Sequence, residues 1–285
     1  MASRKEQKEQ ARAARIAQEQ AAAAGAQRTR RIQIFGGAIA IAVIVIVVVI
    51  AVSSSGGGNA IKPESVAAKA AVKHVNGLLA GIPQSGNTLG KPSAPVTITE
   101  YGDLECSICD VLATPTSFTN PEQEQGSGWA DQLITDYVRT GKAKFVYRSL
   151  ETASGANPDR NAFVQQQVAA EAAGLQGKEW YFIELMYNQQ GPERNNYVTE
   201  SYLQGIAKQI PGLNFKKWMS DRKLAKLKNQ LSVESQQGIN ADGGPKKVST
   251  PTVVISGPRG AASPIIGLPT SGYSGYVAAI KAVVG

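Results

Sequence analysis

The sequence predicts a mixed α/β domain with a helical insertion, preceded by a single transmembrane helix. Three observations lead to this fold class. An uncharged apolar run occupies residues 32–52. Strand, helix and strand patterns follow one another between residues 94 and 150, an order that is typical of parallel strands joined by a crossover. A helix-rich stretch, from about residue 158 to 235, separates these strands from a further strand pattern at 248–255.

Residues 32–52 have the length and composition of a membrane-spanning helix. At about 1.5 Å per residue the run would span about 30 Å, the thickness of a bilayer core. An arginine cluster at 28–31 precedes it, so we expect a cytoplasmic N-terminus and an extracytoplasmic domain from Ser53 onward. A cleaved signal peptide is the alternative, because Ala51 and Ser53 offer small residues for cleavage. The long apolar run and long basic leader favour an uncleaved signal anchor.

The net charge of +8 lies mostly in the N-terminal tail. Residues 1–31 contain eight Lys or Arg side chains and three Glu side chains, which leaves an excess of only +3 for the rest of the chain. A folded domain that binds DNA or RNA carries a basic patch on its own surface. We therefore predict a basic cytoplasmic tail at residues 1–31 and no nucleic-acid partner.

The chain beyond the apolar run divides into a connecting region and one main domain. Residues 53–90 are predicted to hold a flexible Ser- and Gly-rich linker and a short helix at 63–82. This helix carries His74, the only histidine, to which we assign no role. The main domain is predicted to cover residues 91–285, with its helical insertion at about 158–235.

The first half of the main domain has the order strand, helix, strand. Residues 81–95 are rich in Gly, Pro, Ser and Asn and predict a loop. Residues 94–100 alternate β-branched and polar side chains, as a strand does. The elements predicted after them are a short helix at 110–115, a loop at 121–128, a helix at 129–139 and a second strand at 142–150.

The second half of the main domain begins with four helix patterns. Apolar side chains recur at about the 3.6-residue helical spacing in four successive stretches, the last of them from Phe215 to Leu231. A third strand is expected at 248–255, with Pro251 at its start, where a proline is tolerated and a cis bond is expected. A short fourth strand at 263–267 and a closing helix at 273–284 complete the prediction.

The only two cysteines, Cys106 and Cys109, form a C-x-x-C motif between the first strand and the following helix. Residues three positions apart share a helix face, so the two sulfurs can reach bonding distance. The first cysteine would lie at the helix N-terminus, where unpaired N–H groups favour its thiolate. This layout predicts a thiol–disulfide redox site, and an extracytoplasmic location agrees with it.

Three other interpretations of the cysteine pair exist. A zinc site needs about four ligands, but the chain offers two Cys and one His, so we expect neither a metal nor another cofactor. A structural disulfide across so short a loop would restrict the unfolded chain very little. Two buried thiols without a function are the third interpretation.

From about Gly81 to the C-terminus, over roughly 200 residues, the sequence resembles the DsbA-like thioredoxin-fold oxidoreductases, particularly their membrane-anchored bacterial members. The matching pieces are residues 94–103, the C-x-x-C motif, residues 178–181 and residues 249–252. The resemblance implies a thioredoxin-like fold with an inserted helical subdomain and an activity of disulfide exchange in exported proteins.

The resemblance also implies roles for individual residues. Cys106 would be the nucleophile that forms mixed disulfides, and Cys109 the more buried resolving cysteine. Thr250 and cis-Pro251 would flank the sulfurs and offer backbone groups to an extended substrate. Glu100 matches a buried acidic residue that helps proton transfer at the second cysteine, although the sequence equally allows a solvated carboxylate at a strand end.

The motif departs from DsbA in the residues between its cysteines. DsbA carries Pro-His there, whereas this chain carries Ser107 and Ile108 and so lacks a cationic partner for the thiolate. We therefore expect the pKa of Cys106 to lie below that of free cysteine, but to be less lowered than in the strongest oxidases. Three nearby acidic side chains oppose thiolate formation: Asp103, Glu105 and Asp110.

Together these observations predict a membrane-anchored extracytoplasmic thiol–disulfide oxidoreductase that introduces disulfides into reduced exported proteins. The resemblance implies a quinone-coupled membrane oxidase as its electron acceptor. A reductase or isomerase of the same fold is one alternative. A non-catalytic anchored binding module, in which Cys106 and Cys109 form a permanent structural bond, is the other.

Overall fold

The computed structural model describes residues 62, 64–115 and 128–284. Within these residues, no helix combines the length and the apolarity needed to cross a membrane. Four predicted segments lie outside the described residues and stay predictions: the basic tail at 1–31, the signal anchor at 32–52, the linker at 53–59 and most of the loop at 121–128.

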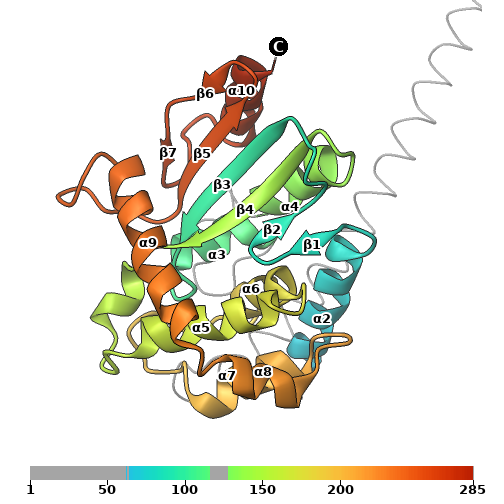
Figure 1. The fold of residues 1–285 in the computed structure, drawn as a ribbon, viewed down its shortest axis with the longest axis vertical. Helices are drawn as coiled ribbons and strands as arrows, with labels where there is room; N and C mark the ends of the chain where they lie inside the picture. The colour runs from blue at the N-terminus through green and yellow to red at the C-terminus, as the bar shows by residue number, and fades with distance from the viewer. Residues whose placement is uncertain (1–61, 63, 116–127, 285) are drawn as a thin grey trace, which may run out of the picture. The chain divides into compact units, whose positions relative to one another are not determined.

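Three strands form the centre of the sheet (Figure 1). Strand β3 (Val96–Gly102) pairs in parallel with β4 (Ala143–Ser149), as the strand–helix–strand order predicts. On its other side β3 pairs antiparallel with β5 (Thr252–Gly257). All three strands are rich in buried side chains, which fits a sheet that is covered on both faces.

Short strands extend both edges of this sheet. A hairpin of β1 (Gln84–Ser85) and β2 (Thr88–Leu89) pairs with β4, so the prediction of a plain loop at 81–95 was wrong. Two-residue strands are too short to produce an alternating pattern. On the opposite edge, β6 (Gly260–Ala261) and β7 (Ile265–Ile266) both pair with β5. The sequence predicted β7 but not β6.

Helices outside the insertion agree with the sequence. Helix α3 (Ser107–Ala113) follows β3 directly, and α10 (Tyr273–Val283) closes the described chain against β5. The predicted helix at 129–139 is α4 (Trp129–Leu133), which continues as a π-helical segment at Ile134–Val138. Helix α2 (Val66–Leu79) lies within its predicted range, and the Ser65 side chain accepts a hydrogen bond from Ala68 N at its start.

The insertion contains five helices rather than four among the described residues. The stretch predicted as one helix from Phe215 to Leu231 is broken at Leu224, which takes an extended backbone conformation. The apolar spacing continues across the break, so the pattern could not reveal it. The last helix ends at Ala241, beyond the predicted boundary near residue 235. The five helices are α5 (Ala162–Gly174), α6 (Glu179–Tyr187), α7 (Glu200–Lys208), α8 (Phe215–Asp221) and α9 (Ala225–Ala241).

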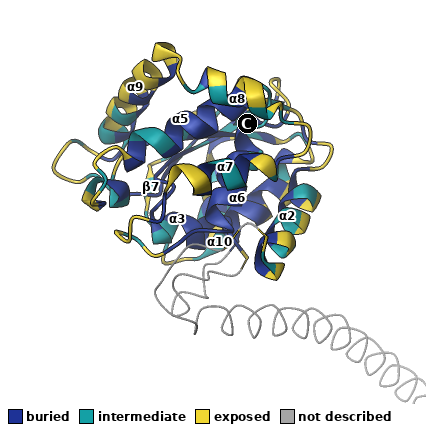
Figure 2. Cartoon of the chain, turned by 90° about the horizontal axis from the view of Figure 1, so that it is seen from below, coloured by how far each residue is buried: buried dark blue, intermediate teal, exposed yellow. Residues whose placement is uncertain are grey.

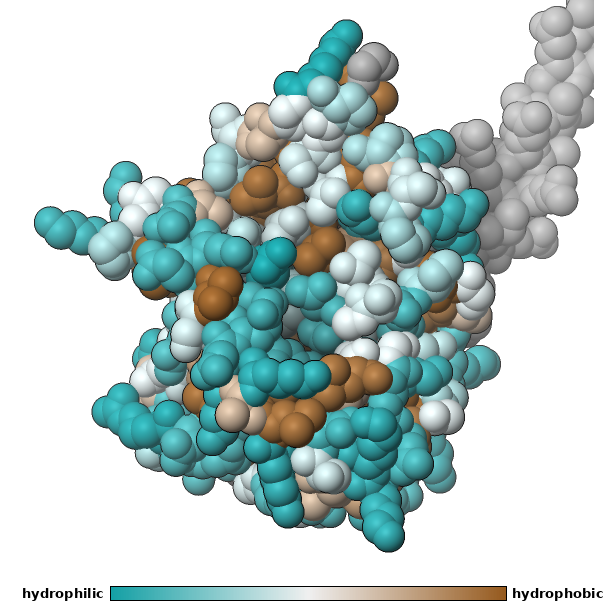
Figure 3. Space-filling view, viewed as in Figure 1, coloured by the Kyte–Doolittle hydropathy of each residue, from teal (hydrophilic) through white to brown (hydrophobic). Residues whose placement is uncertain are grey.

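Helix α6 joins the insertion to the sheet. Nearly all of its side chains are buried, and Figure 2 shows α5 and α6 mostly buried while α8 and α9 carry exposed residues. The Trp180 ring of α6 lies 4.9 Å from the Phe145 ring of β4, measured between centroids, and Trp180 Nε1 donates to Asn87 O. On the face drawn in Figure 3, hydrophilic side chains cover much of the insertion, with apolar ones scattered between them.

Candidate active site

The C-x-x-C motif lies where β3 ends and α3 begins. Cys106 occupies the N-cap position of α3 with an extended backbone (φ −74°, ψ 120°), and Cys109 is the third residue of the helix. Both are free thiols. Cys106 is 6% exposed, whereas Cys109 is fully buried, so the order of burial is the one that the resemblance implies.

The start of β5 brings a proline loop against Cys106. The Thr250–Pro251 peptide bond is cis, as predicted for this position. The Cys106 Sγ donates to Thr250 O over 3.4 Å, although the two residues lie 144 positions apart. The Thr250 hydroxyl in turn bonds to the Thr152 hydroxyl, beyond β4. The structure therefore unites the predicted cysteine motif and the predicted proline loop in one site.

The two thiols differ in electrostatic environment. Hydrogen bonding from the Cys109 side chain, with help from Thr250 and the Cys109 backbone, lowers the pKa of Cys106, while burial and Asp103 oppose this effect. Burial raises the pKa of Cys109 well above that of a free thiol, and the nearby Cys106 and Glu100 raise it further. The direction for Cys106 agrees with the sequence-based expectation, but its largest cause is the partner thiol.

Asp103 organises the loop before the cysteines. Its Oδ1 accepts from Glu105 N, and its Oδ2 accepts from Thr152 N at 2.8 Å and from Ser154 N at 2.9 Å. The Ser154 hydroxyl adds a further bond at 2.7 Å. Burial raises the pKa of Asp103, although these hydrogen bonds favour its carboxylate. The predicted negative charge beside Cys106 is therefore held in place by backbone donors.

Glu105 is also buried beside the motif. Its carboxyl accepts from Asn157 Nδ2 at 2.7 Å and from Gln166 Nε2 at 3.3 Å. Burial raises the pKa of Glu105 to about 7, and Asp103 and Glu193 contribute to the increase. The group directly before Cys106 therefore changes charge near neutral pH.

Glu100 lies on the buried face of β3, and only 3% of it is exposed. It follows Val96 and Ile98, which are also buried, at the two-residue strand spacing, so the three side chains share one face of β3. The alternative of a solvated carboxylate was wrong. Burial raises the pKa of Glu100 to about 8, with a smaller contribution from Cys106. Its charge also acts on Cys109, so the two groups lie within electrostatic reach.

Residues of the insertion that the sequence did not single out contact the active-site loop. Gln190 Nε2 donates to Leu104 O at 2.8 Å and to Cys106 O at 3.3 Å. Glu193 Oε1 accepts from Ser107 N at 2.7 Å. These contacts join positions more than 80 residues apart, and no local motif marks them.

His74, to which no role was assigned, lies next to a buried carboxylate. Its Nε2 is 2.8 Å from Asp131 Oδ2 on α4. Burial raises the pKa of Asp131, and His74 acts in the opposite direction. Among the described residues, no group of three or more His, Cys, Asp and Glu side chains is arranged to hold a metal ion.

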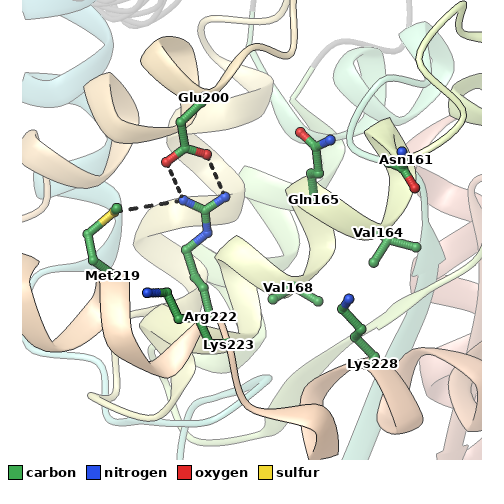
Figure 4. Close-up of a pocket in the computed structure, with 9 residues that line it drawn as sticks. All are labelled: Asn161, Val164, Gln165, Val168, Glu200, Met219, Arg222, Lys223 and Lys228. Atoms are coloured by element: carbon green, nitrogen blue, oxygen red, sulfur yellow. Dashed lines mark hydrogen bonds and ion pairs between the residues drawn. The ribbon is translucent and has the colours of Figure 1, made fainter.

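A pocket of about 420 Å³ lies within the insertion (Figure 4), and neither cysteine lines it. The Arg222 guanidinium lies across it, held by Glu200 through two hydrogen bonds of 2.8 and 2.9 Å. None of the predicted site residues lines this pocket. Its lining is Asn161, Val164, Gln165, Val168, Glu200, Met219, Arg222, Lys223 and Lys228.

Comparisons with known proteins agree with this geometry. The thioredoxin family model matches residues 84–264. A relative from Bacillus cereus, named "Probable disulfide bond formation protein D", is 25% identical over 176 residues, which cover 60% of this chain and 69% of that protein.

Two solved structures share the fold. BdbD from Bacillus subtilis superposes with a TM-score of 0.51 at 18% identity, over 70% of this chain and 95% of that one. The thiol-disulfide exchange protein α-DsbA2 from Wolbachia pipientis has a TM-score of 0.50 at 16% identity, over 75% of this chain and 94% of that one. The chain therefore belongs to the thioredoxin family, in which it is a DsbA-like thiol–disulfide oxidoreductase.

Proposed function

We propose that this protein is a membrane-anchored extracytoplasmic oxidase that introduces disulfides into exported proteins through Cys106 and Cys109. The observation that carries the proposal is the arrangement of the two thiols: Cys106 lies at the N-cap of α3 with its Sγ 3.4 Å from Thr250 O, whereas Cys109 is fully buried. In this arrangement the pKa of Cys106 is lowered, chiefly by the hydrogen bond from Cys109, and burial raises the pKa of Cys109. A stabilised Cys106 thiolate favours the reduced enzyme, and a pair that favours its reduced form is an oxidant. The relative from Bacillus cereus carries disulfide bond formation in its name.

The reaction begins with the oxidised enzyme. A substrate thiolate attacks Cys106 Sγ, because Cys106 is the more exposed sulfur. The Cys106–Cys109 bond breaks, a mixed disulfide forms, and Cys109 leaves as a thiolate. A second substrate thiolate then attacks the substrate sulfur of the mixed disulfide and releases the Cys106 thiolate. The substrate loses two electrons and two protons, and the enzyme pair gains the two electrons.

Glu100 supplies a proton to Cys109 in this scheme. Its pKa of about 8 keeps the carboxyl mainly protonated at neutral pH, and burial separates it from bulk water. The raised pKa of Cys109 means that this thiolate takes up a proton readily once it is released. The same pair of groups acts in reverse when Cys109 is deprotonated during reoxidation.

Thr250 and Pro251 form the docking edge for the substrate. The backbone before β5 passes next to Cys106, and Thr250 O lies 3.4 Å from the sulfur. An extended substrate segment next to its own cysteine can pair with this backbone as an added strand. Such pairing depends on main-chain groups, so it tolerates many substrate sequences.

Anchoring and electron transfer complete the proposal. The apolar run at 32–52 and the basic tail support a signal anchor with the redox domain outside the cytoplasm. A quinone-coupled oxidase of the same membrane would accept the two electrons from the reduced pair. A reductase or isomerase is the second candidate, because the Asp103 carboxylate works against the Cys106 thiolate.

The reduction potential of the Cys106–Cys109 pair tests the direction of electron flow. An oxidase is expected to equilibrate at or above about −180 mV, between protein disulfide isomerase and DsbA, whereas a value near about −270 mV would indicate a reductase. The second measurement is oxidation of a reduced, unfolded substrate protein by the oxidised enzyme. Failure to oxidise it would contradict the oxidase proposal.

Location has its own test. Protease added to intact spheroplasts should digest the redox domain while the N-terminal tail stays protected. In cells that are not treated with protease, the domain should stay in the membrane fraction. A domain released in soluble form would favour a cleaved signal peptide, and a protected domain would contradict the proposed orientation.

A further inference from the structure

The segment that follows α6 holds the active-site loop from the side of the insertion. The Gln190 side chain donates hydrogen bonds to two carbonyl groups of the loop, those of Leu104 and Cys106. Three residues later, Glu193 accepts a hydrogen bond from Ser107 N. The Ser107 nitrogen belongs to the peptide bond that directly follows Cys106. The bond from this nitrogen to Glu193 Oε1 measures 2.7 Å, the short length expected for a charged acceptor.

This contact places a carboxylate beside the nucleophile. A carboxylate a few ångströms from a thiol near a protein surface disfavours the ionisation of that thiol, because like charges repel. Glu193 is half-buried, so solvent screens its charge only in part.

Other acidic groups face Cys106, but they are bound into the fold. Asp103 and Glu105 lie on the loop itself and accept several hydrogen bonds from buried donors, and Glu100 is buried on β3. Removing Asp103 or Glu105 would break several hydrogen bonds that hold the active-site loop. Glu193 reaches the site from a different part of the chain and makes its contact through a single backbone N–H.

We propose that Glu193 sets the oxidising strength of the Cys106–Cys109 pair by destabilising the Cys106 thiolate from the insertion side. The inference rests on the proposed redox function, and it assigns Glu193 a tuning role rather than a catalytic one. It makes the insertion a determinant of the potential: a variant that lacks this charge is a stronger oxidant than the natural protein.

Substitution Glu193→Gln in the full chain tests the inference, because the amide oxygen can still accept from Ser107 N while the charge is lost. We expect the ionisation constant of Cys106 to increase about three- to tenfold, measured from the pH dependence of alkylation. At a pH above the Cys106 pKa, the pair should become more oxidising by the same factor, which corresponds to about 15–30 mV. The difference from the natural protein should shrink at high salt.

Two further variants serve as controls. Glu193→Ala removes charge and acceptor together and should shift the Cys106 pKa at least as far as Glu193→Gln. Glu64→Gln removes one exposed carboxylate before α2 and should leave the pKa and the potential unchanged.

An unchanged Cys106 pKa in Glu193→Gln would overturn the inference, even if Glu193→Ala shifts it, because the hydrogen bond rather than the charge would then be responsible. This outcome is distinguishable from failure of the proposed function. If the proposed function failed, the natural protein itself would not oxidise substrate, whatever the pKa of Cys106 in its variants.

Discussion

Buried carboxyl groups gather in two regions of the molecule, and they are held in different ways. The active-site carboxyls, Asp103 and Glu105, are bound by backbone and amide donors from neighbouring segments. In the insertion, neither oxygen of Glu171 has a hydrogen-bond partner among the described residues. Burial, followed by the charges of Glu234 and Glu179, raises the pKa of Glu171 to about 9.

The comparison shows that a raised pKa does not by itself identify a functional carboxyl. Glu171 is shifted further than Glu100, yet its main electrostatic neighbours are other insertion carboxyls and not the cysteines. Glu100 shares one feature with Glu171 and another with the active-site carboxyls. One of its oxygens is unpartnered like those of Glu171, but it acts on Cys109 and feels Cys106. Electrostatic interaction with a reacting group, rather than the size of the shift, is what distinguishes it.

The largest expected effect tests the cysteines themselves. Cys109→Ala should reduce substrate oxidation by at least about 1,000-fold, because no intramolecular disulfide can form. The pKa of Cys106 should rise, since the Cys109 thiol is the main group that lowers it. Alkylation of Cys106 across pH and capture of mixed disulfides measure both effects. Ser107→Ala is the matched control, because it keeps both thiols and the backbone N–H that Glu193 accepts.

The fold could be predicted where side chains repeat along the chain. Strands β3, β4 and β5 carry enough buried residues to show a pattern, whereas the two-residue strands β1, β2 and β6 do not. Strand β7 is equally short, but its two isoleucines between Pro264 and Gly267 marked it. The site could be predicted where chemistry is local, at the C-x-x-C motif and at the proline before β5. It could not be predicted where partners are distant, as for Glu193 and Ser107, which lie 86 positions apart.

The second prediction concerns the insertion carboxyls and global stability. Burial raises the pKa of Glu179 to about 8, well above its value in an unfolded chain. The folded state therefore binds more protons than the unfolded state between about pH 4.5 and 8. The stability from this group is present below about pH 4.5 and is lost as the pH rises toward 8, at up to about 1.4 kcal/mol per pH unit.

Glu179→Gln should remove this dependence and stabilise the protein at pH 8, measured by urea unfolding across pH. The control is Glu200→Gln, because Arg222 lowers the pKa of Glu200, so its contribution is present at neutral pH and is lost as the pH falls. If both variants changed the pH profile in the same direction, the distinction between buried and paired carboxyls would not hold.

The third prediction concerns the hydrogen bonds that hold the active-site carboxyls. Asp103→Ala should destabilise the fold by about 2–4 kcal/mol, because it leaves the N–H groups of Thr152 and Ser154 without their acceptor. Asp159→Ala removes a carboxyl that accepts from Asn161 N and Gln165 Nε2 in a more exposed position, and it should cost less than about 1 kcal/mol. If Asp103→Ala and Asp159→Ala lost equal amounts of unfolding free energy in urea, the buried N–H donors would matter no more than the exposed ones, and the prediction would be wrong.

The smallest expected effect separates Glu100 from Glu171. Glu100→Gln should slow disulfide exchange about tenfold below pH 8, where the natural carboxyl is mainly protonated and can pass its proton to Cys109. The rate of the variant should lose the inflection near pH 8, and the pKa of Cys109 should fall because one nearby charge is absent. Stopped-flow measurement of exchange from pH 6 to 9 follows both changes. Glu171→Gln removes an even more strongly shifted carboxyl, but it should leave this profile unaltered, since its shift arises from burial and from the charges of Glu234 and Glu179 rather than from the cysteines. A matching loss of the inflection in Glu171→Gln would mean that the two regions act on the cysteines as one electrostatic unit, and a normal profile in Glu100→Gln would remove Glu100 from the proton transfer.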